Sequence, residues 1–278
     1  MARNYYTLDP DCVYLIKKNF NVGRAGKKIE FITRHHLMYI GEGEAVVDGI
    51  WNHRPASAHH IIGPTGRWVQ AVWDRDTAWA NANAWANPRT ITIEHSNNTG
   101  LVANNDFHPD SWNISDETII SGARIAAAYC SKLKLGAPKF GTTIRDHCEF
   151  TATGCPVHLQ GPRPGNAWGG KAGKYHFPWM EEAIDFYDKL EKKLVNPDGS
   201  PAITYKEANM ANFGPDQVGA LDEAKKYAKD ARAQLTGTVK LGEYPGWPQL
   251  GDRTLVDAIG VIGAKLEIPG FYDTKKGA

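Results

Sequence analysis

The sequence predicts a fold of the α/β or α+β class, because candidate strands alternate with candidate amphipathic helices over about residues 1–190. Length and composition agree with this prediction. At 278 residues the chain exceeds the usual domain of roughly 100 to 200 residues, so we expect one enzyme-sized domain plus a smaller module. The formal net charge of +1 and the hydrophobic content of 42% are typical of an ordinary globular protein.

Three runs rich in β-branched and aromatic residues predict strands. They are residues 29–35 (IEFITRH), residues 57–63 (SAHHIIG, followed by a Pro-Gly turn) and residues 91–95 (ITIEH). The connections between these runs are polar and rich in glycine and tryptophan. Five tryptophans gather there: Trp51, Trp68, Trp73, Trp79 and Trp85. Indole rings can stack on sugar faces, but we expect most of these five to belong to the core.

Two helices are predicted in the first part of the chain. Residues 115–135 carry apolar side chains at helical spacing, and Asp116 and Glu117 suit the first turn of a helix. Residues 179–194 (WMEEAIDFYDKLEKKL) predict the second helix. The first domain is therefore expected to span residues 1–194.

A turn-rich segment at residues 195–202 (VNPDGSPA) predicts a linker. Beyond it, residues 203–278 are expected to form a small, mainly helical C-terminal module. Its helices are predicted over residues 216–235 and residues 254–266.

Composition and patterning exclude several classes of protein. The basic residues are interspersed with acids, which argues against a nucleic-acid binder. No stretch approaches the roughly 20 apolar residues of a membrane span, so we expect no membrane insertion. The N-terminus lacks a run typical of a signal peptide, so we expect the protein to be made in the cytoplasm. Four irregularly spaced cysteines do not predict a disulfide framework.

The segment RDHCEFTATGCP, residues 145–156, carries the most chemical information. His147 and Cys155 lie eight positions apart, which suits neither a helix face nor a redox pair, but a loop can fold both onto one cation. Zinc favours imidazole and thiolate ligands, and a catalytic zinc needs a third protein ligand, which His35 or His36 can supply. Two alternatives stay open: Cys148 and Cys155 could form a disulfide or be buried thiols, and the two adjacent histidines could form a solvated strand end.

Taken in order, these elements resemble the amidase-2 family, which comprises N-acetylmuramoyl-L-alanine amidases and peptidoglycan recognition proteins. The resemblance rests on a strand ending in His-His, a strand of the SAHHII type before a turn, a strand ending in ITIEHSN and a closing H-x5-T-x-C-P, over about residues 29–160. It implies a central mixed β-sheet flanked by helices. The tail segment EYPGWPQLGDRTLVDAIGVIG resembles a C-terminal module of lysins from phages of mycobacteria and related actinobacteria.

The resemblance also assigns roles to individual residues. It implies that His35, His147 and Cys155 bind Zn²⁺. Neighbouring side chains of a strand point to opposite faces, so only one of the two adjacent histidines can face the metal; His35 is preferred and His36 is the fallback. It further implies that Glu94 is the catalytic base and that Thr153 donates a hydrogen bond to the developing oxyanion.

Three further positions qualify these roles. Some family members have tyrosine where this chain has Ala58, and others have lysine where it has Thr153. The sequence also leaves two roles open for Asp146: a loop acid in water, or an acceptor that orients an imidazole ligand.

The activity implied is hydrolysis of the amide bond between N-acetylmuramic acid and L-alanine in bacterial peptidoglycan. A phage endolysin is implied, present in the host cytoplasm before lysis and reaching the cell wall after the membrane is permeabilised. We expect a monomer. The alternatives are a non-catalytic peptidoglycan-binding protein and a phage structural component. The C-terminal module is expected either to bind the cell wall or to cap the first domain.

Overall fold

The computed structural model describes residues 2–202, 246–250 and 252–268, together with residues 226, 228, 229, 231 and 233–235. The chain divides into two compact units, Met1–Thr204 and Tyr205–Ala278. Most of the helix predicted over residues 216–235 lies outside the described residues.

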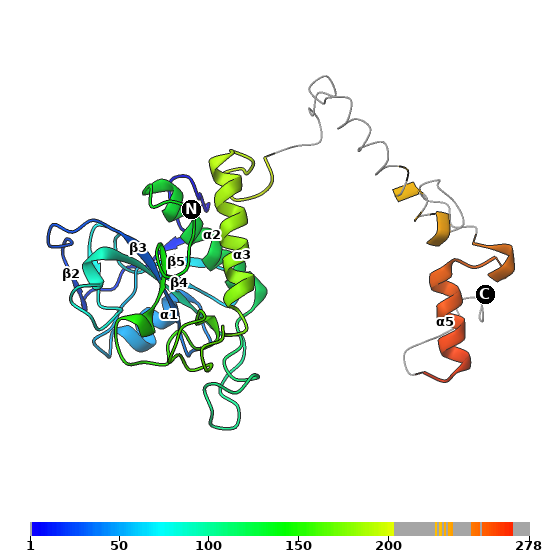
Figure 1. Ribbon diagram of the computed structural model, residues 1–278, viewed down its shortest axis with the longest axis horizontal. Coiled ribbons are helices and arrows are strands. Elements are labelled where there is room, and N and C mark those ends of the chain that lie inside the picture. The colour runs from blue at the N-terminus through cyan, green and yellow to red at the C-terminus, as the bar shows by residue number, and fades with distance from the viewer. Residues whose placement is uncertain are drawn as a thin grey trace, which may run out of the picture. The chain divides into compact units, whose positions relative to one another are not determined.

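A six-stranded mixed sheet forms the centre of the first unit (Figure 1). Its spatial order is β1 (Cys12–Val13), β5 (Trp68–Gln70), β4 (His60–Ile62), β7 (Thr90–His95), β3 (Phe31–His36) and β8 (Ile144–Asp146). The last four run parallel to one another, and β5 is antiparallel to β4. The predicted α/β fold with a central mixed sheet is therefore confirmed. A separate two-stranded sheet pairs β2 (Phe20–Asn21) with β6 (Thr77–Ala78).

The central strands are buried on both faces, as expected where helices or loops cover a parallel sheet. All six residues of β3 are buried, and β7 is buried except at Glu94. The three predicted strands correspond to β3, β4 and β7, although β4 is shorter than its apolar run. The remaining strands have only two or three residues, which is too short for a recognisable pattern.

Two long helices cover one face of the sheet (Figure 1). They are α2 (Asp116–Lys132) and α3 (His176–Glu191), which pack against each other. Helix α2 begins where predicted, because the Ser115 side chain accepts a hydrogen bond of 3.2 Å from the Thr118 N–H and so caps the first turn. Helix α3 begins three residues before the predicted start.

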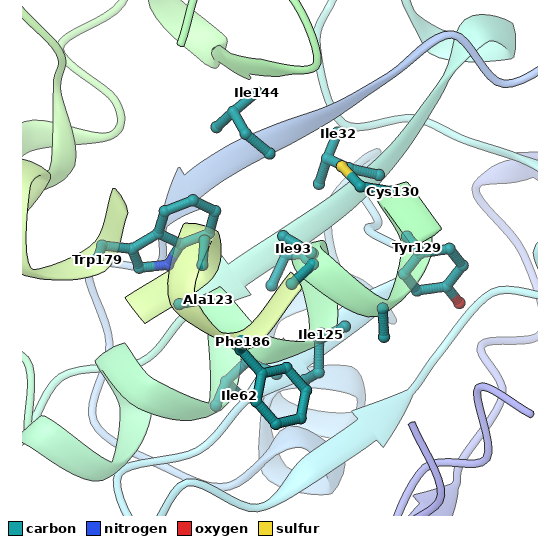
Figure 2. Close-up of a cluster of buried hydrophobic side chains, with 14 of the residues drawn as sticks. Ile32, Ile62, Ile93, Ala123, Ile125, Tyr129, Cys130, Ile144, Trp179 and Phe186 are labelled. Carbon is teal, nitrogen blue, oxygen red and sulfur yellow. The ribbon is translucent and has the colours of Figure 1, made fainter. Parts of the chain in front are cut away.

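The main core lies between this helix pair and the sheet. Figure 2 shows isoleucines of the strands meeting apolar side chains of the two helices. The labelled members are Ile32, Ile62, Ile93, Ala123, Ile125, Tyr129, Cys130, Ile144, Trp179 and Phe186. A second, smaller core on the opposite face includes Ile61 and Leu37 and is covered by α1 (Gly43–Val46) and the π-helical turn Val47–Trp51. The sheet is thus packed on both faces, which holds its strand ends in fixed positions.

The segment predicted as a linker, residues 195–202, belongs to the first compact unit. Val195 is buried and its carbonyl accepts a 2.9 Å hydrogen bond from the Tyr6 hydroxyl. The Tyr5 N–H donates to the Pro197 carbonyl at 2.8 Å.

In the second unit, α5 (Leu255–Lys265) corresponds to the helix predicted over residues 254–266, and the Thr254 side chain caps it. Among the helices of the described residues, none is both long and apolar enough to cross a membrane.

One close approach between α2 and the sheet makes a test of this packing. A Cβ atom on Gly122 would collide with the imidazole of His95, which is fully buried and held by hydrogen bonds at both ring nitrogens. Although alanine favours a helix over glycine by about 1 kcal/mol, we expect Gly122→Ala to lower the free energy of unfolding by about 1–3 kcal/mol, the usual cost of overpacking. Chemical denaturation measures this change.

Gly49→Ala is the matched control, because a Cβ atom there meets open space. Its free energy of unfolding should stay the same or rise. Equal stability of the two variants would contradict the close packing of α2 on β7.

Candidate metal centre

The candidate ligands lie at the carboxyl ends of neighbouring parallel strands. His35 ends β3 with His36, and it is paired in register with Glu94 of β7. His147 follows β8, the strand on the other side of β3. Parallel strands end at the same edge of a sheet, so residues far apart in the sequence meet here.

The structure brings His35, His147 and Cys155 together. Their potential ligand atoms all lie within 4.8 Å of one another. The centroids of the two imidazole rings are 4.4 Å apart, and the Cys155 Sγ atom lies 3.8 Å from His35 Nδ1. Two imidazoles and a thiol in this arrangement form a donor set that zinc prefers.

A neighbouring amide fixes the orientation of the His35 ring. His35 Nε2 and the Asn81 Oδ1 atom form a 3.1 Å hydrogen bond, in which the amide oxygen can only accept. The proton therefore resides on Nε2, and the lone pair of Nδ1 faces Cys155. Asn81 is fully buried. It lies in a connection without a recognisable pattern, so it could not be selected from the sequence.

His147 supplies the strongest evidence that the site suits a metal. Both of its ring nitrogens are buried and have no hydrogen-bond partner among the described residues. Burial lowers the pKa of His147 to about 4 and that of His35 well below its usual value, with the neighbouring imidazole adding to the effect on His35. Both rings are therefore neutral at pH 7, which is the form that binds a metal.

Cys155 enters from the loop after β8. All four cysteines are free thiols, so the alternative of a disulfide between Cys148 and Cys155 is not seen. The His36 N–H donates to Cys155 Sγ at 3.3 Å, which favours a thiolate. Burial and then the charge of Glu94 raise the pKa of the Cys155 thiol well above its usual value. A cation that binds here would counter both effects.

Glu94 borders the three candidate ligands. Its Oε1 atom lies 3.9 Å from His35 Nδ1, and its Oε2 atom is buried without a partner among the described residues. Burial raises the pKa of Glu94 to about 8, although the charge of Arg54 opposes this rise. The carboxyl group can therefore exchange a proton near neutral pH, as a general acid or base must.

A cavity of about 250 Å³ opens onto these groups. Thr153 lines its wall and is exposed. The Thr153 Oγ1 atom accepts a 3.2 Å hydrogen bond from the Cys155 N–H, which leaves the hydroxyl hydrogen available to a ligand. The Trp79 and Arg54 side chains line the same cavity and also a larger neighbouring cleft.

His36 lies outside the cluster. Its Nε2 atom is hydrogen bonded to the Asn97 side chain, and its ring faces that of His158. The two neighbouring histidines of β3 therefore have different environments.

Neither role considered for Asp146 is correct. The side chain is buried rather than solvated, and it forms an ion pair of 2.8 Å with Arg34 of β3 instead of binding an imidazole ligand. Asp146 could not be selected from the sequence as the partner of Arg34, since the two residues are 112 positions apart.

The expectation that most of the five tryptophans belong to the core is wrong. Trp51 and Trp68 are core residues. The other three have exposed fractions of 37–49%: Trp73, Trp79 and Trp85. Of these three, Trp79 lines the cavity at the candidate metal centre.

Comparison with known proteins identifies two regions of the chain. The family described as N-acetylmuramoyl-L-alanine amidase matches residues 25–158, and the family described as Rv3766 C-terminal domain matches residues 216–271. The first match covers the ends of β3, β7 and β8 together with Cys155. No curated protein matches the chain.

Several solved structures have a similar course of the chain. The catalytic domain of XlyA is 14% identical with a TM-score of 0.41, and the match covers 62% of this chain and 97% of that one. The amidase endolysin LysCS from Clostridium intestinale is 16% identical with a TM-score of 0.37, covering 53% and 87%. The endolysin of the Thermus scotoductus bacteriophage Ph2119 is 14% identical with a TM-score of 0.40, covering 60% and 91%. These values are too low for residue roles to be transferred.

The orientation of His35 can be tested without any metal. We expect Asn81→Ala to remove the acceptor for the His35 Nε2–H, so that the ring populates both tautomers. Because a buried donor is then left unpaired, the free energy of unfolding should fall by about 1–3 kcal/mol. Imidazole nitrogen chemical shifts and chemical denaturation measure the two effects. Asn81→Asp keeps an acceptor oxygen and should preserve the tautomer; a single tautomer in Asn81→Ala would rule out this role.

Proposed function

Since residues 25–158 match the family described as N-acetylmuramoyl-L-alanine amidase, we propose that this protein is a zinc-dependent hydrolase of bacterial peptidoglycan. The bond cleaved is the amide between N-acetylmuramic acid and L-alanine. The observation that supports zinc dependence most directly is the convergence of His35, His147 and Cys155 within 4.8 Å. Both ring nitrogens of His147 are buried, and within the part of the chain that the structure describes neither has a hydrogen-bond partner, so a lone pair is available to a metal.

The three side chains would hold zinc through His35 Nδ1, an imidazole nitrogen of His147 and the Cys155 thiolate. When bound, zinc acts as a Lewis acid towards a carbonyl oxygen and lowers the pKa of water towards 7. The cavity beside the cluster leaves room for water and substrate, as a catalytic site requires.

Glu94 is the proton carrier of the proposed reaction. Its carboxylate takes a proton from the attacking water, and its carboxylic acid returns the proton to the nitrogen of the departing L-alanine. Without that proton the amine would be a poor leaving group. Burial gives Glu94 a pKa of about 8, so both protonation states are accessible at neutral pH.

Thr153 is suited to stabilise the negative charge that develops on the carbonyl oxygen. The residue lines the cavity, and its backbone partner Cys155 holds the Thr153 oxygen in place while leaving its proton free. A neutral hydroxyl contributes less than a lysine ammonium would, so more of the charge falls to the metal.

We further propose a role at the cell wall for the second unit. We place this protein among phage endolysins: a monomer that is held in the host cytoplasm until the membrane is permeabilised and then lyses the wall. In this proposal residues 203–278 bind the wall polymer, and residues 195–202 connect them to the catalytic part. Tethering an enzyme to an insoluble substrate raises its local concentration. The presence of Glu94 beside a complete ligand set favours catalysis over binding alone.

The ligand set can be tested by metal analysis. We expect about one zinc per wild-type chain and a loss of zinc from His147→Ala and from Cys155→Ala, because each removes one of three ligands. Cys148→Ala is the matched control and should keep its zinc, since Cys148 is a thiol next to His147 in sequence but outside the cluster. Full occupancy in the two ligand variants would show that other residues bind the metal.

The activity can be tested on purified cell walls. Mass spectrometry of the digest should find new amino termini on L-alanine. Glu94→Gln should retain zinc and lose about 10²- to 10⁴-fold in rate, the usual contribution of a general acid or base. New reducing sugars without new amino termini would contradict the amidase assignment, and wild-type turnover in Glu94→Gln would remove Glu94 from the mechanism.

A further inference from the structure

A buried ion pair lies directly behind the candidate metal centre. Arg34 immediately precedes His35 on β3, and Asp146 immediately precedes His147 on β8. The two charged residues are paired in register across the parallel strands. Their side chains are 0% and 2% exposed, so this is a fully desolvated pair.

The contacts of the pair are extensive. Arg34 Nε and Nη2 both donate to the Asp146 Oδ1 atom, at 2.9 and 2.8 Å. The second carboxylate oxygen of Asp146 accepts a 2.7 Å hydrogen bond from the Gly161 N–H. Arg34 Nη2 also contacts His176 Nδ1 at 3.1 Å, and burial together with the Arg34 charge lowers the pKa of His176 to about 4, so this ring is a neutral acceptor.

A side chain of helix α3 packs against the Arg34 guanidinium. The Arg34 guanidinium carbon lies 4.8 Å from the ring centroid of Trp179. The indole N–H of Trp179 donates to His95, whose other ring nitrogen bonds to the His35 carbonyl at 2.8 Å. The ion pair and the backbone of His35 are therefore attached to the same helix.

Successive side chains of a strand point to opposite faces. Arg34 points towards α3, so His35 points to the other face, where it meets His147. The spacing between the two imidazoles then depends on the spacing between β3 and β8, which the Arg34–Asp146 bridge fixes one residue before each imidazole.

We propose that Arg34 and Asp146 are positioning residues for the metal centre. They hold the ends of β3 and β8 at the separation that lets His35 and His147 share one cation. This inference rests on the proposed function, since it assigns a metal to the two imidazoles. A buried ion pair contributes little to stability compared with an apolar pair of similar size, which suggests that its role here is to define geometry.

The test uses the full chain with Arg34→Met combined with Asp146→Asn. Removing both charges leaves no unpaired buried charge, and asparagine keeps an acceptor for the Gly161 N–H, so this variant should still unfold cooperatively. We expect its dissociation constant for zinc, measured by competition with a chelator, to rise by about 10- to 100-fold, the usual effect of losing a residue that orients a ligand. The visible absorption of the Co²⁺-substituted protein should also change.

Arg34→Lys is a second variant in case the double variant does not fold. Lysine keeps the charge but cannot make the two guanidinium hydrogen bonds that converge on Asp146 Oδ1, so zinc binding should again weaken. Arg124→Lys is the matched control. Arg124 forms a 2.6 Å ion pair with Glu182 and packs on Phe186 between α2 and α3, away from the candidate ligands, and its substitution should leave the zinc affinity and the Co²⁺ spectrum unchanged.

Folded variants of Arg34 with wild-type zinc affinity and an unchanged Co²⁺ spectrum would overturn the positioning role alone. A wild-type chain that binds no zinc would instead contradict the proposed function. In that case crystal structures of the metal-free proteins decide, because the positioning role requires the two ring centroids to move apart from 4.4 Å in the Arg34 variants and not in Arg124→Lys.

Discussion

The parallel alignment of β3, β7 and β8 is the constraint on which the rest of this structure depends. It brings His35, Glu94 and His147 to one edge of the sheet from positions as far as 112 residues apart in the sequence. All three side chains are largely shielded from solvent there. Burial lowers the pKa of both histidines and raises the pKa of Glu94, so the neutral form of each group is favoured. Unpaired buried polar atoms each cost about 1–3 kcal/mol. Several such atoms, on His147 and Glu94, lie together at this edge of the sheet, and none of them has a hydrogen-bond partner among the described residues.

The two faces of the sheet differ in how their buried polar groups are hydrogen bonded. On the side of α2 and α3, most of the buried polar groups near the site are paired: Arg34 with Asp146, and His95 with Trp179 and the His35 carbonyl. The Arg34 Nη1 atom is an exception, with no hydrogen-bond partner among the described residues. On the opposite side, the imidazoles and Glu94 keep free lone pairs. A paired network in a close-packed interior has little freedom to move, so it can hold the open groups in place.

Much of the fold could be predicted because the central strands are apolar runs of ordinary length. The end of the first predicted strand made His35 and His36 candidates, and the His147 to Cys155 spacing indicated a loop that folds back. Glu94 was implied only by the resemblance to a family. The resemblance to a family then favoured a zinc site with His35, His147 and Cys155 over a disulfide, buried thiols or a solvated strand end. Asn81 could not be found in this way, because it lies in an irregular connection and its role depends on a hydrogen bond to a residue 46 positions away.

Arg34 is a charged residue in a run that predicts a buried strand. A charged residue inside a fully buried strand must have a partner, since leaving an isolated charge in the interior is far too costly. The sequence IEFITRH therefore called for a buried acid somewhere in the chain. Asp146 met that need, yet its position beside His147 suggested a loop acid or a role at the metal instead. Register resolves the ambiguity: when β3 and β8 align so that their histidines meet, the residues before those histidines must also meet, on the other face. The ligand pair and the ion pair are therefore two consequences of one strand alignment, and a shift of a single residue would abolish both.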